Sequence, residues 1–97
     1  MTQAQQVQVR MANRPDYREN YANSVQIRGN LWDFFLTFGV LDQSSAESVS
    51  VQNFQGVYLS PQTAKVLLNI LQQHIAQYEA TFGEVHLEAK PPESVIQ

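Results

Sequence analysis

The chain has 97 residues, 43% of them hydrophobic, and a formal net charge of −3 at pH 7. This length predicts a single domain with a modest core, and the apolar content is typical of a globular protein. The chain has no cysteine, which excludes a disulfide framework and a thiolate metal site. It shows no apolar run of membrane-spanning length and no hydrophobic signal region near Met1, so we expect a cytoplasmic protein that does not bind membranes.

Charge is distributed unevenly along the chain. Residues 1–28 carry four arginines against Asp16 and Glu19, whereas residues 29–97 carry two lysines against seven acidic residues. The basic N-terminal part could attract an anion or an acidic partner. Nucleic-acid surfaces usually combine clustered Lys and Arg with a basic isoelectric point, and the isoelectric point here is about 5.1. We therefore expect no nucleic-acid binding.

Two strands are predicted in the first part of the chain. Residues 1–6 are polar and are expected to be disordered. Val7, Val9 and Met11 alternate with polar residues, a pattern that predicts a first strand. Residues 12–20 form a turn-rich connection, and a second strand is expected over residues 21–28.

A third strand is predicted over residues 31–40, after a hairpin signal at Gly29 and Asn30. Its alternation places four large apolar side chains on one face, and these are expected to form the core against a helix: Trp32, Phe34, Leu36 and Phe38. A polar loop over residues 42–48 leads to a fourth strand over residues 49–59.

The strongest local signal is a helix between Ser60 and Gly83. Ser60 is a preferred N-cap residue, Pro61 suits the first helical position, and glycine commonly ends a helix. Apolar residues recur at steps of three and four and form one stripe: Ala64, Leu68, Leu71, Ile75, Tyr78 and Phe82. Such a stripe packs on a sheet or, as the alternative, pairs with a second helix as a coiled coil.

These elements predict an α+β fold, with an antiparallel sheet of about four strands and one long C-terminal helix packed on one face. The single domain is expected to span residues 7–88. Residues 89–97, which include Pro91 and Pro92, are expected to form a flexible tail.

Two apolar groups fall outside the expected core and are candidate interfaces. Val66 and Ile70 project from the side of the helix opposite its stripe, among uncharged glutamines. Phe35, Phe54 and Tyr58 are expected on the sheet face that turns away from the helix. Because a contiguous exposed apolar patch is unusual for a monomer, two-fold association through one of these faces is expected.

A polar segment before the second strand is a candidate recognition edge. It comprises Tyr21, Asn23 and Ser24, with Arg28 further along the strand. The simpler interpretation is that these side chains satisfy hydrogen bonds of a turn. His74 and His86 lack the partners that a base or a metal site requires, so we expect no catalytic residue, metal site or cofactor.

Three separated segments carry a family resemblance: YANSVQI at residues 21–27, DFFLTFG at residues 33–39, and LSPQTAKVLLNILQQHIAQYEATFG at residues 59–83. Together they resemble a small bacterial family catalogued as a domain of unknown function, number 3467. Many relatives place an acidic residue before the Phe-Gly pair, where this chain has Thr37. The resemblance implies a small α+β bacterial cytoplasmic protein and brings no agreed activity.

The leading functional hypothesis is a non-enzymatic protein-interaction module that forms a homodimer. One alternative is a chaperone-like or adaptor protein that binds extended peptides at a sheet edge. Another is a sensor of a small anion or nucleotide that uses Arg28 and the segment from Tyr21 to Ser24.

Overall fold

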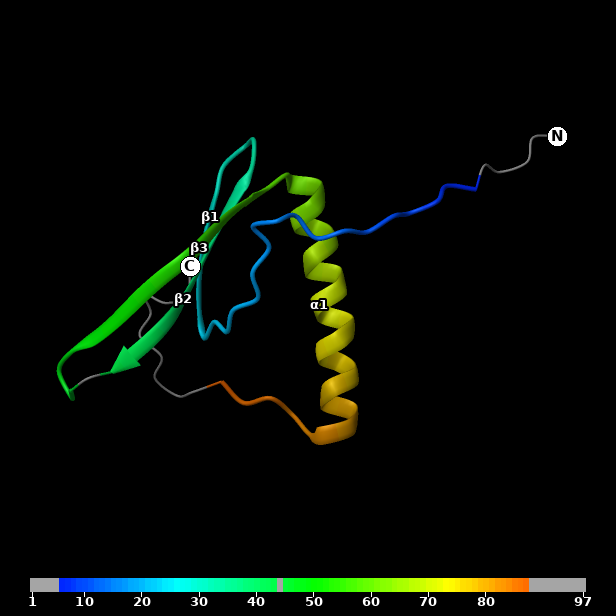
Figure 1. Cartoon of the computed structure of the whole chain (residues 1–97). Coiled ribbons are helices and arrows are strands. Elements are labelled where there is room, and N and C mark those ends of the chain that lie inside the picture. Colours follow the sequence, from blue (N-terminus) through cyan, green and yellow to red (C-terminus); the bar gives the residue numbers. More distant parts are fainter. Residues whose placement is uncertain (1–5, 44, 88–97) are drawn as a thin grey trace.

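A computed structural model describes residues 6–43 and 45–87. Three strands precede one helix: β1 (Ser24–Gly29), β2 (Phe34–Gln43), β3 (Val49–Leu59) and α1 (Pro61–Phe82). The strands form an antiparallel meander in the order β1-β2-β3, followed by the helix (Figure 1). The predicted α+β class, with an antiparallel sheet and a long C-terminal helix, is confirmed. Of residues 1–6, which are expected to be disordered, all but Gln6 lie outside the described residues, and the tail expected over residues 89–97 lies outside them as well.

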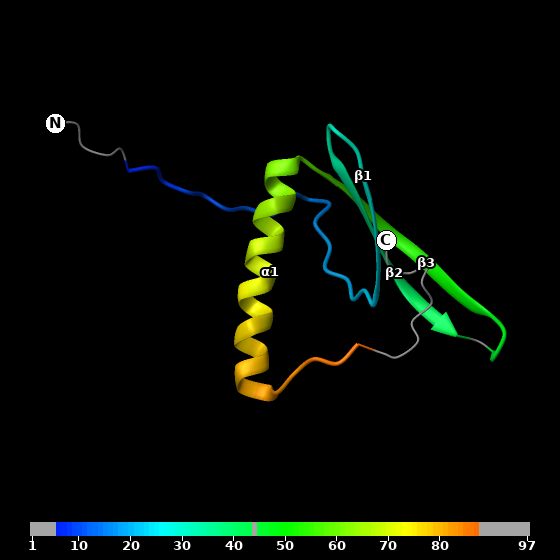
Figure 2. The same cartoon turned by 180° about the vertical axis from the view of Figure 1, so that it is seen from behind.

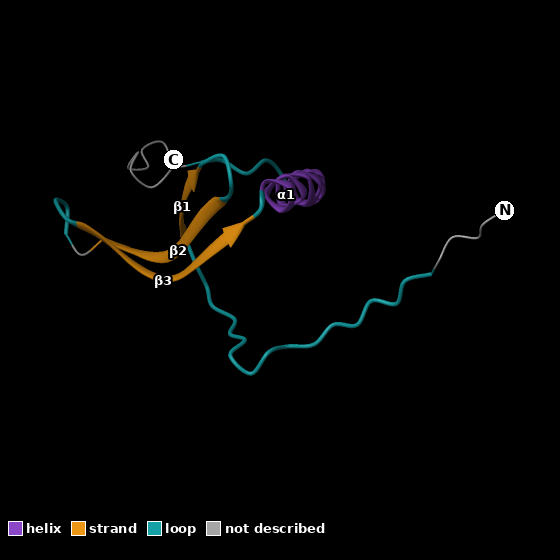
Figure 3. Ribbon diagram, turned by 90° about the horizontal axis from the view of Figure 1, so that it is seen from above, coloured by secondary structure: helices purple, strands orange, loops and turns teal. Residues whose placement is uncertain are grey.

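The prediction of a strand over residues 7–11 is wrong. These residues are extended but unpaired, and Val7, Val9 and Met11 are all exposed. Figure 3 shows this segment leading away from both the sheet and the helix. Alternation is a property of the segment alone, whereas a strand also requires a neighbouring edge to supply backbone hydrogen bonds. The described part of the chain therefore contains a sheet of three strands instead of about four.

The connection between β1 and β2 corrects the expected position of Trp32. The Asn30 Oδ1 atom accepts hydrogen bonds from the backbone N–H groups of Trp32, at 2.7 Å, and of Asp33, at 3.0 Å. This side chain closes the turn, so β2 begins at Phe34 and not at residue 31. Trp32 lies in the turn and is 77% exposed, and it is not part of the core.

The sheet face that lies towards the helix carries two adjacent cross-strand rows of apolar residues. Leu36 pairs with Ile27 on β1 and with Val57 on β3, and Phe34 pairs with Leu59. Leu36, at 7% exposure, is the one hydrophobic side chain classed as buried among the described residues. The expected face is thus present, but a single chain buries very little of it.

A register shift between Phe38 and Gly39 interrupts the pairing of β2 with β3. Phe38 pairs with Gln55 and Gly39 with Asn53, so Phe54 is the additional residue of a bulge in β3. A bulge breaks the strict alternation of a strand. Phe54 accordingly lines a hollow of about 250 Å³ together with Phe38 and Gln55. The prediction that Phe54 shares a face with Tyr58, which assumed strict alternation, is therefore wrong.

Both ends of α1 match the sequence prediction. Ser60 Oγ accepts a hydrogen bond from the backbone N–H of Thr63 at 3.1 Å, and Pro61 is the first helical residue. At the other end Gly83 has a φ of 105°, and its N–H donates to the carbonyl of Glu79 at 3.0 Å. Glycine is favoured there because a positive φ is costly for other residues.

The helix stands away from the sheet along most of its length. It starts beside the end of β3 and diverges from the strands towards Phe82 (Figures 1 and 2). None of the α1 residues is buried. The expectation that the sheet covers most of the stripe is wrong, because the sheet faces only the first half of α1.

Candidate interaction surface

An apolar hollow of about 530 Å³ separates the first half of α1 from the sheet. The sheet contributes Ile27, Phe34, Leu36 and Leu59 to its walls, and the helix contributes residues that include Ala64, Leu68 and Leu71. Lys65 is the one charged residue in this lining, at its helical side. Contact between water and apolar walls of this extent is unfavourable, and an apolar group that displaces the water would be stabilising.

The second half of the stripe continues beyond the hollow as an exposed apolar ridge, formed by Ile75, Tyr78 and Phe82. The rings of Tyr78 and Phe82 pack together, with their centroids 4.9 Å apart and their planes tilted by 47°. Phe82 is nevertheless 73% exposed. The first half of α1 therefore borders an apolar hollow, and its second half carries an aromatic ridge.

The opposite side of α1 carries the predicted interface residues Val66 and Ile70. Both are exposed, and the 47% exposure of Ile70 equals that of Ile75 in the stripe. Exposure therefore does not distinguish the two sides of this helix. The distinction lies in continuity, because the stripe extends into the hollow whereas Val66 and Ile70 lie among the polar residues Gln62, Gln73 and Gln77.

On the other face of the sheet, a row of side chains runs across all three strands. The Arg28 guanidinium carbon lies 4.9 Å from the centre of the Phe35 ring, which lies 4.5 Å from the ring of Tyr58. A Cβ atom at Gly56 would come within 2.7 Å of the Phe35 ring, so this glycine provides the space for the aromatic side chain. Because its neighbours partly cover Phe35, which is half-buried, this face offers less free apolar surface than the sequence predicted, although Tyr58 remains exposed.

The segment that contains Tyr21, Asn23 and Ser24 extends the β1–β2 ladder. The Asn23 N–H donates to the Gly39 carbonyl at 3.1 Å, and Asn23 Oδ1 accepts from the Leu41 N–H at 2.7 Å. Ser24 is buried and Tyr21 is exposed. Arg28 lies four residues further along β1, or about 13 Å. The structure does not bring Arg28 beside this segment, and Asn23 has a structural role.

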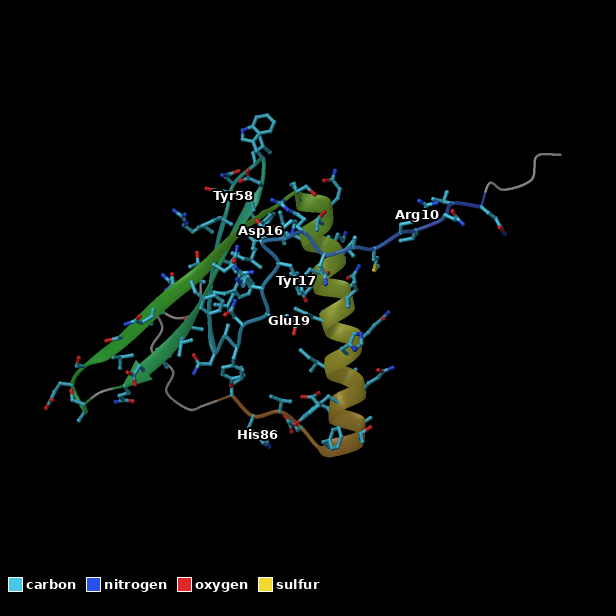
Figure 4. The ribbon with its side chains drawn as sticks, viewed as in Figure 1. Arg10, Asp16, Tyr17, Glu19, Tyr58 and His86 are labelled. Atoms are coloured by element: carbon cyan, nitrogen blue, oxygen red, sulfur yellow. The ribbon has the colours of Figure 1, made fainter. Side chains whose placement is uncertain are left out.

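Short-range polar contacts occupy the N-terminal segment (Figure 4). Arg14 and Asp16 form an exposed ion pair with a nitrogen–oxygen distance of 3.2 Å. The Tyr17 hydroxyl donates to a Glu19 carboxylate oxygen at 2.6 Å, and this bond raises the pKa of Tyr17. Among the described residues no group of three or more His, Cys, Asp or Glu side chains is arranged to hold a metal ion. These contacts connect neighbours in the chain and assemble no site.

Comparison with known proteins identifies a family but no characterised relative. The model of a family described as protein of unknown function (DUF3467) matches residues 1–87. No curated protein and no solved structure matches the chain. Within the described residues, no helix combines the length and the apolar character needed to cross a membrane.

Proposed function

The chain belongs to the family described as protein of unknown function (DUF3467), and we propose that it is a non-enzymatic interaction module that acts as a homodimer. The observation that supports this proposal is the uncovered apolar stripe of α1. Leu68, Leu71, Ile75 and Tyr78 are each about half exposed, and Phe82 more so. Monomeric proteins rarely leave an apolar surface of this continuity in contact with water.

The small core of a single chain supports the same proposal. Folding must offset the conformational entropy of the chain, and burial of apolar surface is the main favourable contribution. Here Leu36 is the single hydrophobic side chain classed as buried among the described residues. A chain of this length needs more buried apolar surface than that to be stable. An additional surface must cover the stripe and the hollow whenever the protein is folded.

A second copy of the chain meets this requirement without any other component. It is available in equal amount wherever the protein is made, and it carries the same apolar surfaces. Closed two-fold dimers are the commonest soluble assemblies, since one self-complementary patch covers itself. In this proposal the stripe of α1 and the facing side of the sheet form the interface, while Val66 and Ile70 remain outside it.

The binding of an extended peptide at a sheet edge is a second candidate, favoured by the free side of β3. In the order β1-β2-β3, this strand has one neighbour within the sheet. Proteins usually protect an edge strand with charged residues or a proline. The eleven residues of β3 include neither. A peptide added there would leave α1 uncovered, so homodimerisation accounts for more of the exposed surface. The small-anion hypothesis has less support, because Arg28 lies over the Phe35 ring and not beside the segment from Tyr21 to Ser24.

The thermal stability of the protein at different chain concentrations tests the proposal. Association that is coupled to folding makes the melting temperature depend on concentration. We therefore expect the midpoint measured by circular dichroism to rise as the chain concentration increases from about 1 to 100 μM. A midpoint that stays constant over this range would contradict a dimer that is required for folding.

A further inference from the structure

We propose that two copies pair through antiparallel α1 helices, with the Tyr78–Phe82 ring pair of each copy seated in the apolar hollow of the other. This inference rests on the proposed self-association and adds to it the orientation, the register and the contacts. It places the two-fold axis between the two helices, at the height of their middle residues. The occupant of the hollow is thus a specific part of a second copy.

The positions of the hollow and the ring pair favour the antiparallel orientation. The hollow is lined by the first half of the stripe, including Ala64 and Leu68, and the ring pair lies in the second half, at Tyr78 and Phe82. In an antiparallel pair the end of one helix lies beside the start of the other, so each ring pair meets a hollow. A parallel pair would place the two ring pairs together and leave both hollows without an occupant.

The stripe also has the spacing that such a pair requires. It consists of two series with a period of seven, Ala64-Leu71-Tyr78 and Leu68-Ile75-Phe82, as in coiled-coil seams. When the two antiparallel helices cross at the height of Gln73, every member of one series lies opposite a member of the other series on the partner helix. Three kinds of layer result, each present twice by symmetry: Ala64 with the partner's Phe82, Leu68 with the partner's Tyr78, and Leu71 with the partner's Ile75. The aromatic ring of Phe82 thus faces the smallest side chain of the stripe, which allows close packing.

Charge placement agrees with the same register. Lys65 and Glu79 lie on one flank of the stripe, and each is seven positions from Gln72. In the antiparallel pair, Lys65 and the partner's Glu79 are offset along the helix axis by two residues, or about 3 Å. These long side chains can span that offset. Glu79 Oε2 accepts a hydrogen bond from the Val85 N–H at 3.0 Å, and this contact orients the carboxylate while its other oxygen stays available. Flanking charges of opposite sign help to set helix orientation and partner choice.

Two adjacent glutamines offer a matched test in a chain that has no cysteine of its own. At about 100° per residue, Gln72 projects about 80° from the centre of the stripe, whereas Gln73 projects about 180° from it. In the proposed pair Gln72 lies next to its own two-fold mate. We expect Gln72→Cys to give a covalent dimer as the main product with a short bifunctional maleimide, and Gln73→Cys to give none.

A mixing experiment tests the register directly. Lys65→Cys alone and Glu79→Cys alone should remain uncross-linked, because neither position lies beside itself. After the two variants are mixed, unfolded and refolded together, the reagent should produce a cross-linked heterodimer. If light scattering shows a dimer but Gln72→Cys and the mixture both stay uncross-linked, the antiparallel register is wrong while self-association stands. A monomer that binds a small apolar molecule in the hollow would overturn both proposals.

Discussion

Leu71→Glu should abolish the dimer. Leu71 lies in the middle of the stripe and lines the apolar hollow, so the proposed interface would have to bury its carboxylate without a partner. Burial of an unpaired charge costs several kcal/mol. At about 1.4 kcal/mol per factor of ten, a cost of about 4 kcal/mol raises the dissociation constant roughly a thousandfold. Sedimentation velocity at micromolar concentration should show that this variant no longer forms the dimer that the wild-type chain forms.

Ile70→Glu is the matched control for this prediction. Ile70 is adjacent in the sequence and 47% exposed, compared with 48% for Leu71, but it projects from the opposite side of the helix. We expect this variant to dimerise with nearly the wild-type constant, since surface changes usually stay within about 0.5 kcal/mol. Phe35→Glu should also leave the dimer intact. If Ile70→Glu or Phe35→Glu dissociates the dimer and Leu71→Glu does not, the interface lies on the other side of the helix or the sheet.

Leu36→Ala should cost about 2–5 kcal/mol of the free energy of unfolding. Leu36 lies near the start of β2, the middle strand of the sheet, between Ile27 and Val57, and is only 7% exposed. Truncation at this position removes apolar contacts on both sides and leaves a cavity. Urea unfolding, followed by circular dichroism at one fixed chain concentration, should show the midpoint shifted to lower denaturant.

Trp32→Ala serves as the comparison in the same measurement. The alternation over residues 31–40 predicts that Trp32 shares the core face with Leu36, which would make its loss cost about 3–5 kcal/mol. In the structure Trp32 is in the turn and 77% exposed, so we expect a change within about 0.5 kcal/mol. A large loss of stability in Trp32→Ala, with little change in Leu36→Ala, would contradict the placement of the core.

Features that depend on local chemistry could be predicted from the sequence. The start of α1 at Pro61 and its end before Gly83 follow from capping groups within one turn of each terminus. The limits of β3 likewise match the predicted range. The alternation in β2 identifies Leu36 as a core residue, because residues two apart share one face of a strand.

Features that depend on distant partners could not be predicted in the same way. The bulge at Phe54 exists only in relation to β2, and the turn closed by Asn30 moves Trp32 out of the strand. Residues 7–11 have the pattern of a strand but no edge beside them in the described structure. An amphipathic stripe shows that a helix buries one face, yet it does not identify the surface that covers it. The hollow next to Leu71 became apparent only from the position of α1 relative to the sheet.

The molar mass of the wild-type chain in solution shows whether the chain forms a homodimer. Size-exclusion chromatography with multi-angle light scattering should give about 22 kDa, twice the 11.0 kDa of the single chain, at chain concentrations from about 1 to 100 μM, a range in which complexes with nanomolar dissociation constants stay associated. A folded species of 11 kDa throughout this range, with the helical content that α1 predicts, would contradict the account.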